Sequence, residues 1–345
     1  MKRWFAKTVV FLLLLTTALS GCAGSERGEA GEAAEEERKI SIVSTIFPQY
    51  DWTRQILGER AGDVELTLLL NSRIDLHNYQ PSVDDMIKIS GCDLFVYVGG
   101  ESDGWVEEVL ESAGNDDMIV VNLLDALGSA AKTEEIIEGM AESAGDPGDH
   151  GHSHSHGEEE SLEQEAEYDE HVWLSLKNAQ LLCSAIADAL SALDAGNAEA
   201  YQSNLAAYLE ELSTLDAAYQ AAVNAAPVKT LLFGDRFPFR YLTDDYGLRY
   251  YAAFAGCSAE TEASFETIIF LAEKMDELRL THIMVTESSD QRIAETIRNN
   301  TVEKNQQILV LDAMQSVTLR DISDGASYLS IMVRNLDVLK EALRD

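Results

Sequence analysis

Four of the seven histidines in this 345-residue chain alternate with glycine and serine in one short stretch. They are His150, His152, His154 and His156, and acidic residues lie on both sides of them. Imidazoles spaced in this way on a polar, exposed stretch can gather around one divalent ion without a fixed geometry. A polar loop without a ligand is the alternative. The stretch therefore predicts an accessory capture loop for a borderline cation such as zinc.

His77 and His171 share a different pattern, in which an aspartate stands two residues before the histidine. These carboxylates, Asp75 and Asp169, can orient the imidazole or cap the next turn. His77 also follows a predicted strand, at the end where open α/β sheets place their ligand sites. A lone histidine is more often structural than ligating, but these two flank the histidine-rich stretch. We therefore interpret them as two ligands of one metal ion.

The elements that must position these histidines alternate between strand and helix. Short β-branched runs predict strands at residues 40–46, 64–70, 94–98 and 118–123, and again at 228–233, 249–254, 282–286 and 308–311. Apolar residues at helical spacing occupy the intervals. Such alternation is typical of parallel sheets with helices on their faces. We therefore expect an α/β fold with two lobes, each holding a mostly parallel sheet flanked by helices.

One long helix separates the two predicted lobes. Residues 198–225 contain neither glycine nor proline, and at 1.5 Å per residue they would extend about 42 Å. Because that is longer than one small domain needs, we interpret this helix as a rigid strut. The predicted domains are a first lobe at 40–196 with an acidic histidine-rich loop at about 141–168, a linking helix at 197–226 and a second lobe at 227–345.

Residues 1–21 have the features of a signal peptide. A basic start precedes an apolar run at 9–15, which is too short to cross a bilayer, since that needs about 20 apolar residues. Residues 19–22 resemble the lipobox of bacterial lipoproteins, in which the cysteine is lipidated. We expect export and a lipid at Cys22 that anchors the protein to the extracellular or periplasmic face of the membrane, followed by a flexible acidic tether at 22–39. Export without a lipid is the alternative.

The charge balance bears on the class of partner. Asp and Glu number 61 against 25 Lys and Arg, which gives a formal net charge of −36. A nucleic-acid binder needs a basic stripe to displace counterions, and the sequence has none. We therefore exclude nucleic acid as a partner, whereas a cation would be attracted.

Three cysteines remain after the predicted lipid site: Cys92, Cys183 and Cys257. An odd number in an exported protein leaves at least one thiol unpaired. None has the CxxC spacing of a structural zinc knot. One disulfide is possible, and its pairing stays open.

Several motifs in combination resemble one family. They are DxHxYxPS at 75–82, the histidine-rich loop, DxHVWL at 169–174 and the closing stretch at 328–339. From about residue 40 to its end, the chain resembles the zinc and manganese solute-binding lipoproteins of bacterial ABC transporters. The resemblance implies two α/β lobes joined by a rigid helix, with a metal between them. It also implies that His77 and His171 match the family's first two ligands.

The resemblance further implies two ligands from the second lobe. The third, His or Glu in the family, comes from the turn after that lobe's first strand, where this chain has Gly234 and Asp235. Asp235 either supplies an oxygen, pairs with a nearby arginine or caps the next helix. The fourth comes from the turn after the last strand, matched by Asp312, which could instead cap a helix. Glu287, which ends the preceding strand, is a further candidate.

These observations predict a solute-binding lipoprotein that captures a divalent metal and delivers it to an ABC permease as a monomer. Two imidazoles with one or two carboxylates suit Zn²⁺, whereas more oxygen would favour Mn²⁺. The exposed histidines, and the resemblance of residues 234–241 and 256–265 to a zinc-type subgroup, favour zinc. A manganese-specific protein and a metal-buffering or adhesin lipoprotein without a transporter are the alternatives. The sequence lacks HExxH and a Gly-rich phosphate loop, and we identify no separate acid or base beside the predicted ligands, so we expect no enzyme.

Overall fold

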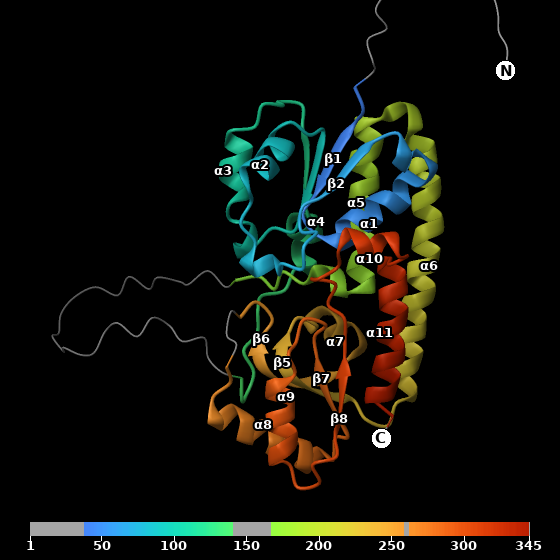
Figure 1. Ribbon diagram of the computed structural model, residues 1–345. Coiled ribbons are helices and arrows are strands. Elements are labelled where there is room, and N and C mark those ends of the chain that lie inside the picture. Colours follow the sequence, from blue (N-terminus) through green and yellow to red (C-terminus); the bar gives the residue numbers. More distant parts are fainter. Residues whose placement is uncertain (1–37, 141–166, 259–261, 345) are drawn as a thin grey trace, which may run out of the picture. The chain divides into compact units, whose positions relative to one another are not determined.

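The structure, a computed structural model, describes residues 38–140, 167–258 and 262–344 (Figure 1). The predicted signal peptide, the lipid site Cys22, almost all of the tether and the capture loop with its four histidines lie outside these residues. Lys39–Asp345 forms one compact unit. Within the part of the chain that the structure describes, no helix is long and apolar enough to cross a membrane.

The first lobe is built on a four-stranded sheet with the order β2-β1-β3-β4, in which all strands are parallel. Its strands are β1 (Ser41–Ser44), β2 (Glu65–Leu68), β3 (Leu94–Tyr97) and β4 (Ile119–Asn122). Its helices are α1 (Phe47–Leu57), α2 (Val83–Ser90), α3 (Val106–Glu111), α4 (Leu123–Leu127) and α5 (Leu176–Leu193). The central strands β1 and β3 are largely buried, as is usual for parallel sheets covered by helices, whereas the edge strands β2 and β4 are mostly half-buried.

The second lobe repeats this strand order as β6-β5-β7-β8, again all parallel. Its strands are β5 (Thr230–Phe237), β6 (Arg249–Ala255), β7 (His282–Val285) and β8 (Gln307–Val310). The helices that follow residue 230 are α7 (Arg240–Tyr246), α8 (Phe265–Leu278), α9 (Arg292–Asn300), α10 (Leu319–Ser323) and α11 (Tyr328–Ala342). Two parallel-sheet lobes confirm the predicted fold class.

The long helix α6 (Ala198–Ala225) has the predicted bounds and contacts elements of both lobes. Near its start, the Asn204 side chain donates to the carbonyl of Ile56 on α1 (2.9 Å), and near its end the Tyr219 hydroxyl donates to the carbonyl of Met332 on α11 (2.6 Å). α11 runs beside it (Figure 1). Apolar side chains three or four residues apart line its buried face, so it packs along its length instead of crossing solvent.

The larger of two hydrophobic cores extends through both lobes, and a smaller one lies between strands β5, β6 and β7 and helices α8 and α9. Buried polar contacts join the lobes within the larger core. Trp173 Nε1 donates to the carbonyl of Ala313 (2.9 Å), and the Tyr328 hydroxyl donates to the carbonyl of Trp173 (2.7 Å). The Trp52 and Tyr328 rings lie 5.1 Å apart, edge to face. The sheets of the two lobes therefore pack on one continuous hydrophobic core.

β5 extends four residues beyond the predicted strand 228–233, with a shift in its pairing to β6 between Phe233 and Arg236. Gly234 lies at this irregularity. A Cβ at Gly234 would stand 2.7 Å from Ala294 Cα on α9, closer than real Cβ atoms approach. The glycine is thus required by the packing of α9 against β5, which explains why no side chain extends from this position.

Candidate metal centre

His77 lies in a 3₁₀ turn, Leu76–Asn78, in the loop that follows β2. Asp75 caps the turn, because its Oδ1 accepts a hydrogen bond from the His77 backbone N–H (3.1 Å). Leu76 is buried beneath it. On the far side, the Tyr79 hydroxyl donates to Asp85 at the start of α2 (3.1 Å). The turn therefore holds His77 from both ends.

His171 is fully buried at the start of a second 3₁₀ turn, Val172–Leu174. Asp169 Oδ1 accepts from the His171 backbone N–H (2.9 Å) and lies 3.0 Å from its Nδ1. In both Asp-x-His patterns the aspartate thus accepts from the backbone N–H of the histidine. At His77 this caps the turn, and at His171 the aspartate also orients the ring.

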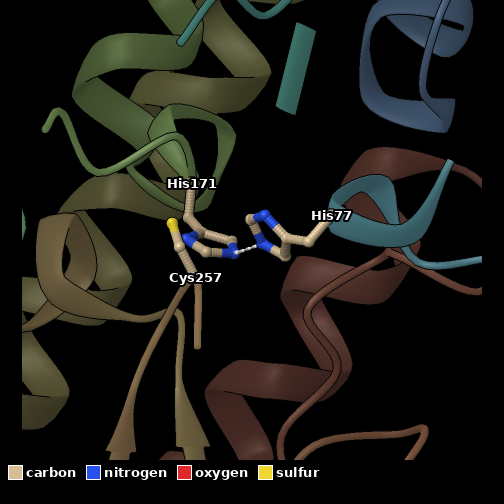
Figure 2. Close-up of side chains that lie close together, drawn as sticks. All are labelled: His77, His171 and Cys257. Atoms are coloured by element: carbon tan, nitrogen blue, oxygen red, sulfur yellow. Dashed lines mark hydrogen bonds between the residues drawn. The ribbon is translucent and has the colours of Figure 1, made fainter. Parts of the chain in front are cut away.

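The two rings face each other through their Nε2 atoms, which are 3.2 Å apart (Figure 2). Two zinc–nitrogen bonds of tetrahedral geometry would hold such atoms about 3.3 Å apart. The Nδ1 atoms face away from this point. His77 Nδ1 lies 2.8 Å from Ser102 Oγ and 3.4 Å from Glu170 Oε2, so each ring has a carboxylate behind it. Such partners fix which nitrogen faces a metal.

Cys257 completes the cluster from the second lobe, two residues after β6. One ligand atom from each of His77, His171 and Cys257 lies within 4.8 Å of the others. Among residues 38–140, 167–258 and 262–344, no other group of three histidine, cysteine, aspartate or glutamate side chains meets this criterion. Two nitrogens and one sulfur form a donor set that suits Zn²⁺ better than Mn²⁺.

The backbone around Cys257 brings its thiol close to His171. At Gly256 a Cβ would stand 2.9 Å from the Phe237 carbonyl oxygen and 3.0 Å from His171 Cε1, so glycine permits this approach without displacing the backbone. The Cys257 N–H donates to Glu134 Oε1 (2.8 Å). Burial raises the pKa of the Cys257 thiol well above its usual range, and the charges of Glu134, Asp169 and Glu170 raise it further. The thiol therefore keeps its proton until a cation displaces it.

Sequence reasoning did not identify Cys257 as a ligand, since it considered only whether this cysteine is paired. Cys92, Cys183 and Cys257 are all free in the structure. The position of Cys257 could have identified it as a ligand, because it follows the second strand of its lobe, as His77 does in the first lobe.

Asp235 and the neighbouring Arg236 lie within β5, where the family resemblance implies a turn that carries a third ligand. Asp235 Oδ2 accepts from the Thr286 N–H (2.9 Å) and hydroxyl (2.7 Å), which ties β5 to the end of β7. Arg236 Nη2 pairs with Asp75 Oδ2 of the first lobe (2.5 Å). Asp235 is not part of the His–His–Cys cluster, and its role as a ligand stays a prediction.

Glu287 and Asp312 lie together but apart from the cluster, beside a cavity of about 430 Å³ that Arg73 and Arg334 also line. Glu287 accepts from the backbone N–H groups of Ala313 (2.8 Å) and Gln315 (2.9 Å), and Asp312 Oδ1 accepts from Met314 (2.8 Å). Burial raises the pKa of both carboxyls, and at Glu287 the charge of Asp312 adds to this effect. These carboxylates organise the loop after β8, and their role as ligands also stays a prediction.

A cavity of about 270 Å³ opens onto His77 and Cys257. Its charged lining is acidic: Glu101, Glu134, Glu167 and Glu170. The charge of Glu101, partial burial and the charge of Glu134 raise the pKa of Glu167. Carboxylates that repel one another in this way favour a cation beside them.

Comparison with known proteins points to one family. The family model described as "Zinc-uptake complex component A periplasmic" matches residues 42–342. The zinc-binding lipoprotein AdcA of Streptococcus pneumoniae strain R6 is 32% identical over 335 residues, which cover 97% of this chain and 61% of that protein. The high-affinity zinc uptake system protein ZnuA of Bacillus subtilis is 29% identical over 342 residues, which cover 99% of this chain and 98% of that protein. The chain thus spans about three fifths of the first relative and nearly all of the second.

Comparison with solved structures gives the same result as comparison of the sequences. The Zn(II)-bound ZnuA-like domain of Streptococcus pneumoniae AdcA has a TM-score of 0.66 at 28% identity, covering 89% of this chain and 100% of that domain. The metal-dependent lipoprotein YcdH from Bacillus subtilis has a TM-score of 0.68 at 26% identity, covering 88% of this chain and 99% of that one. Both have the fold described above.

Proposed function

Because the chain belongs to the zinc-uptake complex component A family, we propose that it captures Zn²⁺ outside the cytoplasm, as a monomer, and delivers the ion to an ABC permease. Its ligands are His77, His171 and Cys257. The observation that carries this proposal is the 3.2 Å separation of the two Nε2 atoms, together with the gathering of one ligand atom from each of His77, His171 and Cys257 within 4.8 Å. The predicted lipid at Cys22 would keep the protein at the membrane where the permease lies.

The donor set supports zinc over manganese. Mn²⁺ prefers oxygen ligands, whereas imidazole and thiolate suit Zn²⁺. Three protein ligands leave one coordination position open. An open position suits a carrier, since the ion can be handed over by exchange of a ligand without loss of all contacts at once.

Electrostatics supports capture of a cation. The acidic cavity leads to His77 and Cys257, and a field of one sign raises the local concentration of the opposite ion. The histidine-rich stretch at 150–156 would add a weak, exposed binding step before this cavity. Its four imidazoles act as an accessory, because the three ligands of the cluster come from elsewhere in the chain.

Because His77 and Cys257 belong to different lobes, a bound ion links the two sheets. Binding would then shift the population of lobe arrangements toward the one in which all three ligands meet. A permease that recognises this arrangement would discriminate loaded from empty protein.

The test is zinc and manganese content together with competitive affinity, measured on the mature chain, on a variant lacking residues 141–166 and on the double variant His77→Ala, His171→Ala. His282→Gln is the matched control, since His282 begins β7 at the opposite end from the cluster. We expect the deletion and His282→Gln to keep one tightly bound zinc and the double variant to lose it. Loss of tight binding on deletion alone, or retention in the double variant, would contradict the proposal.

Delivery is tested by growth under zinc chelation of the source organism lacking its own copy of the gene. The wild-type chain should restore growth, and the double variant should not. Added zinc should rescue both, whereas rescue by manganese alone would favour the manganese alternative.

A further inference from the structure

Two segments near the cluster lie side by side as an antiparallel pair: residues 132–135 and residues 167–169. We call them the paired segments. The Asp169 N–H donates to the carbonyl of Lys132 (2.8 Å), which joins one segment to the other. The second paired segment leads directly to His171, so the contacts that fix these segments also bear on the place of that ligand. The inference that follows rests on the proposed function.

Tyr241, on α7 of the second lobe, binds both paired segments. Its hydroxyl accepts from the Lys132 N–H and donates to the carbonyl of Asp169, both at 2.9 Å. The Tyr241 side chain is buried, so water does not replace these bonds if they are lost. The carboxylate of Asp169 in turn accepts from the His171 N–H and lies 3.0 Å from its Nδ1. The Tyr241 hydroxyl thus links the second lobe to the carboxylate that orients His171.

Glu134, in the first paired segment, contacts the ligand that the second lobe supplies. Its Oε1 accepts from the Cys257 N–H (2.8 Å). Its own backbone N–H donates to the carbonyl of Glu167 in the other segment (2.8 Å). The same pair of segments therefore leads to His171 and fixes the backbone of Cys257. The distance between these two ligands depends on it.

The first paired segment also makes weaker contacts with the second lobe. Lys132 Nζ lies 2.8 Å from Asp244 Oδ2 on α7, and the Tyr250 hydroxyl of β6 donates to Glu135 Oε2 (3.3 Å). These side chains are partly exposed, and exposed ion pairs contribute little free energy. We therefore expect the buried hydrogen bonds of Tyr241 to be the stronger attachment.

We propose that Tyr241 and Glu134 are positioning residues of the zinc site. Tyr241 fixes Asp169 and thereby the direction of the His171 ring. Glu134 fixes the Cys257 backbone and thereby the place of its thiol. Neither residue donates an atom to the ion. Because a thiolate suits Zn²⁺ and Mn²⁺ prefers oxygen, Glu134 also contributes to the preference for zinc.

Tyr241→Phe, made in the full mature chain, tests the first assignment, because it removes the hydroxyl and keeps the ring. Tyr246→Phe is the matched control, since Tyr246 is also buried on α7 and its hydroxyl donates to Asp216 instead (2.8 Å). We expect Tyr241→Phe to weaken zinc binding about 10-fold, as the loss of such partners does, and Tyr246→Phe to leave it unchanged. Competition with a chelator measures the affinity. Denaturant unfolding of the metal-free protein should show a similar loss of stability in both variants.

Glu134→Ala tests the second assignment, with Glu134→Gln and Glu135→Ala beside it. Glu134→Gln keeps a side-chain oxygen for the Cys257 N–H, whereas Glu135→Ala removes an equal charge from the neighbouring residue. We expect Glu134→Ala to bind zinc about 10- to 100-fold more weakly and to lose less affinity for Mn²⁺ than for Zn²⁺. The thiolate charge-transfer band of its cobalt(II) form should weaken. The other two variants should resemble the wild type.

Wild-type zinc affinity in Tyr241→Phe would overturn the assignment of Tyr241, and so would an equal loss in Tyr246→Phe, because the effect would then be a general loss of stability. Wild-type affinity and cobalt spectrum in Glu134→Ala would overturn the assignment of Glu134. So would Glu134→Gln or Glu135→Ala binding zinc as weakly as Glu134→Ala, because charge and not the hydrogen bond would then be responsible. A wild type that binds no zinc at the cluster would instead refute the proposed function itself.

Discussion

The two lobes have the same strand order, and in both the loop after the second strand supplies a donor to the cluster. In the first lobe that loop follows β2 and carries His77; in the second it follows β6 and carries Cys257. The supports differ. A carboxylate caps the turn at His77, whereas Gly256 brings the chain at Cys257 against His171. Topology therefore determines where a ligand stands, and the local sequence determines which donor atom it offers.

The loops after the first strands differ more. After β1, Gln49 Oε1 accepts from the N–H groups of Thr45 (3.0 Å) and Ile46 (3.2 Å), so the loop is closed on itself. After the pairing shift in β5, Asp235 binds the neighbouring strand and Arg236 reaches into the first lobe. The segment after β1 thus hydrogen-bonds to itself, whereas Arg236 in the last part of β5 contacts the other lobe.

The largest expected effect tests the equivalence of the two ligand loops. His77→Ala and Cys257→Ser should each weaken zinc binding about 100-fold or more, because each removes one of three protein ligands. Chelator competition measures the loss. In the cobalt(II) form, Cys257→Ser should lose the thiolate charge-transfer band while His77→Ala keeps it. If only His77→Ala weakens zinc binding, Cys257 is not a ligand, and the loops after β2 and β6 are not equivalent.

A second test concerns the buried carboxyls that follow the third strands, Asp103 after β3 and Glu287 after β7. Each accepts hydrogen bonds from backbone N–H groups. Burial raises the pKa of Asp103 to about 7, and that of Glu287 is also raised. The unfolded chain therefore binds fewer protons than the folded chain between about pH 4 and pH 7, so folding stability falls as pH rises through this window.

Asp103→Asn should remove its part of this pH dependence, on the order of a few kcal/mol between pH 4 and pH 7. Denaturant unfolding of the metal-free protein at several pH values measures it. Glu287→Gln, in the other lobe, should also reduce the pH dependence of folding stability. If a substitution leaves the slope of the unfolding free energy against pH unchanged, the carboxyl that it removes has an ordinary pKa in the folded protein. Asp125→Asn, at an exposed carboxyl on α4, is the control.

The smallest effect concerns the position where the family resemblance implied a third ligand. Gly234→Ala should destabilise the fold by about 1–3 kcal/mol, because the new Cβ meets the backbone of α9 and overpacking has this cost. Thermal unfolding measures it, with Gly62→Ala as the control, since no atom lies within 4 Å of a Cβ there. Gly234→His should lose more stability and bind zinc no more tightly. A tighter site in Gly234→His would show that this turn can still ligate.

The sequence predicted the two parallel-sheet lobes and the bounds of α6, because strand–helix alternation and an uninterrupted helical run are local signals. It also predicted the pairing of His77 with His171. Glu287 and Asp312 each stand two residues after the end of a strand, as expected, whereas Asp235 lies within β5 because that strand continues to Phe237. Their oxygens, however, accept hydrogen bonds mostly from backbone N–H groups of other loops, and such partners depend on tertiary packing. Cys257 was missed for the same reason, since no local pattern reports which ring a thiol will meet.

The core that α6, Trp173 and Tyr328 share between the lobes has a consequence for the energetics of binding. Most of the entropy lost on bringing the two lobes together has already been lost when the chain folds, so the ion need only select among the lobe arrangements that this shared core still allows. Such preorganisation favours slow dissociation, because tight binding is expressed mainly in the off-rate. We therefore expect dissociation of the ion to be slow when the protein is alone. The free energy needed to separate the ligand loops would come from binding to the membrane partner.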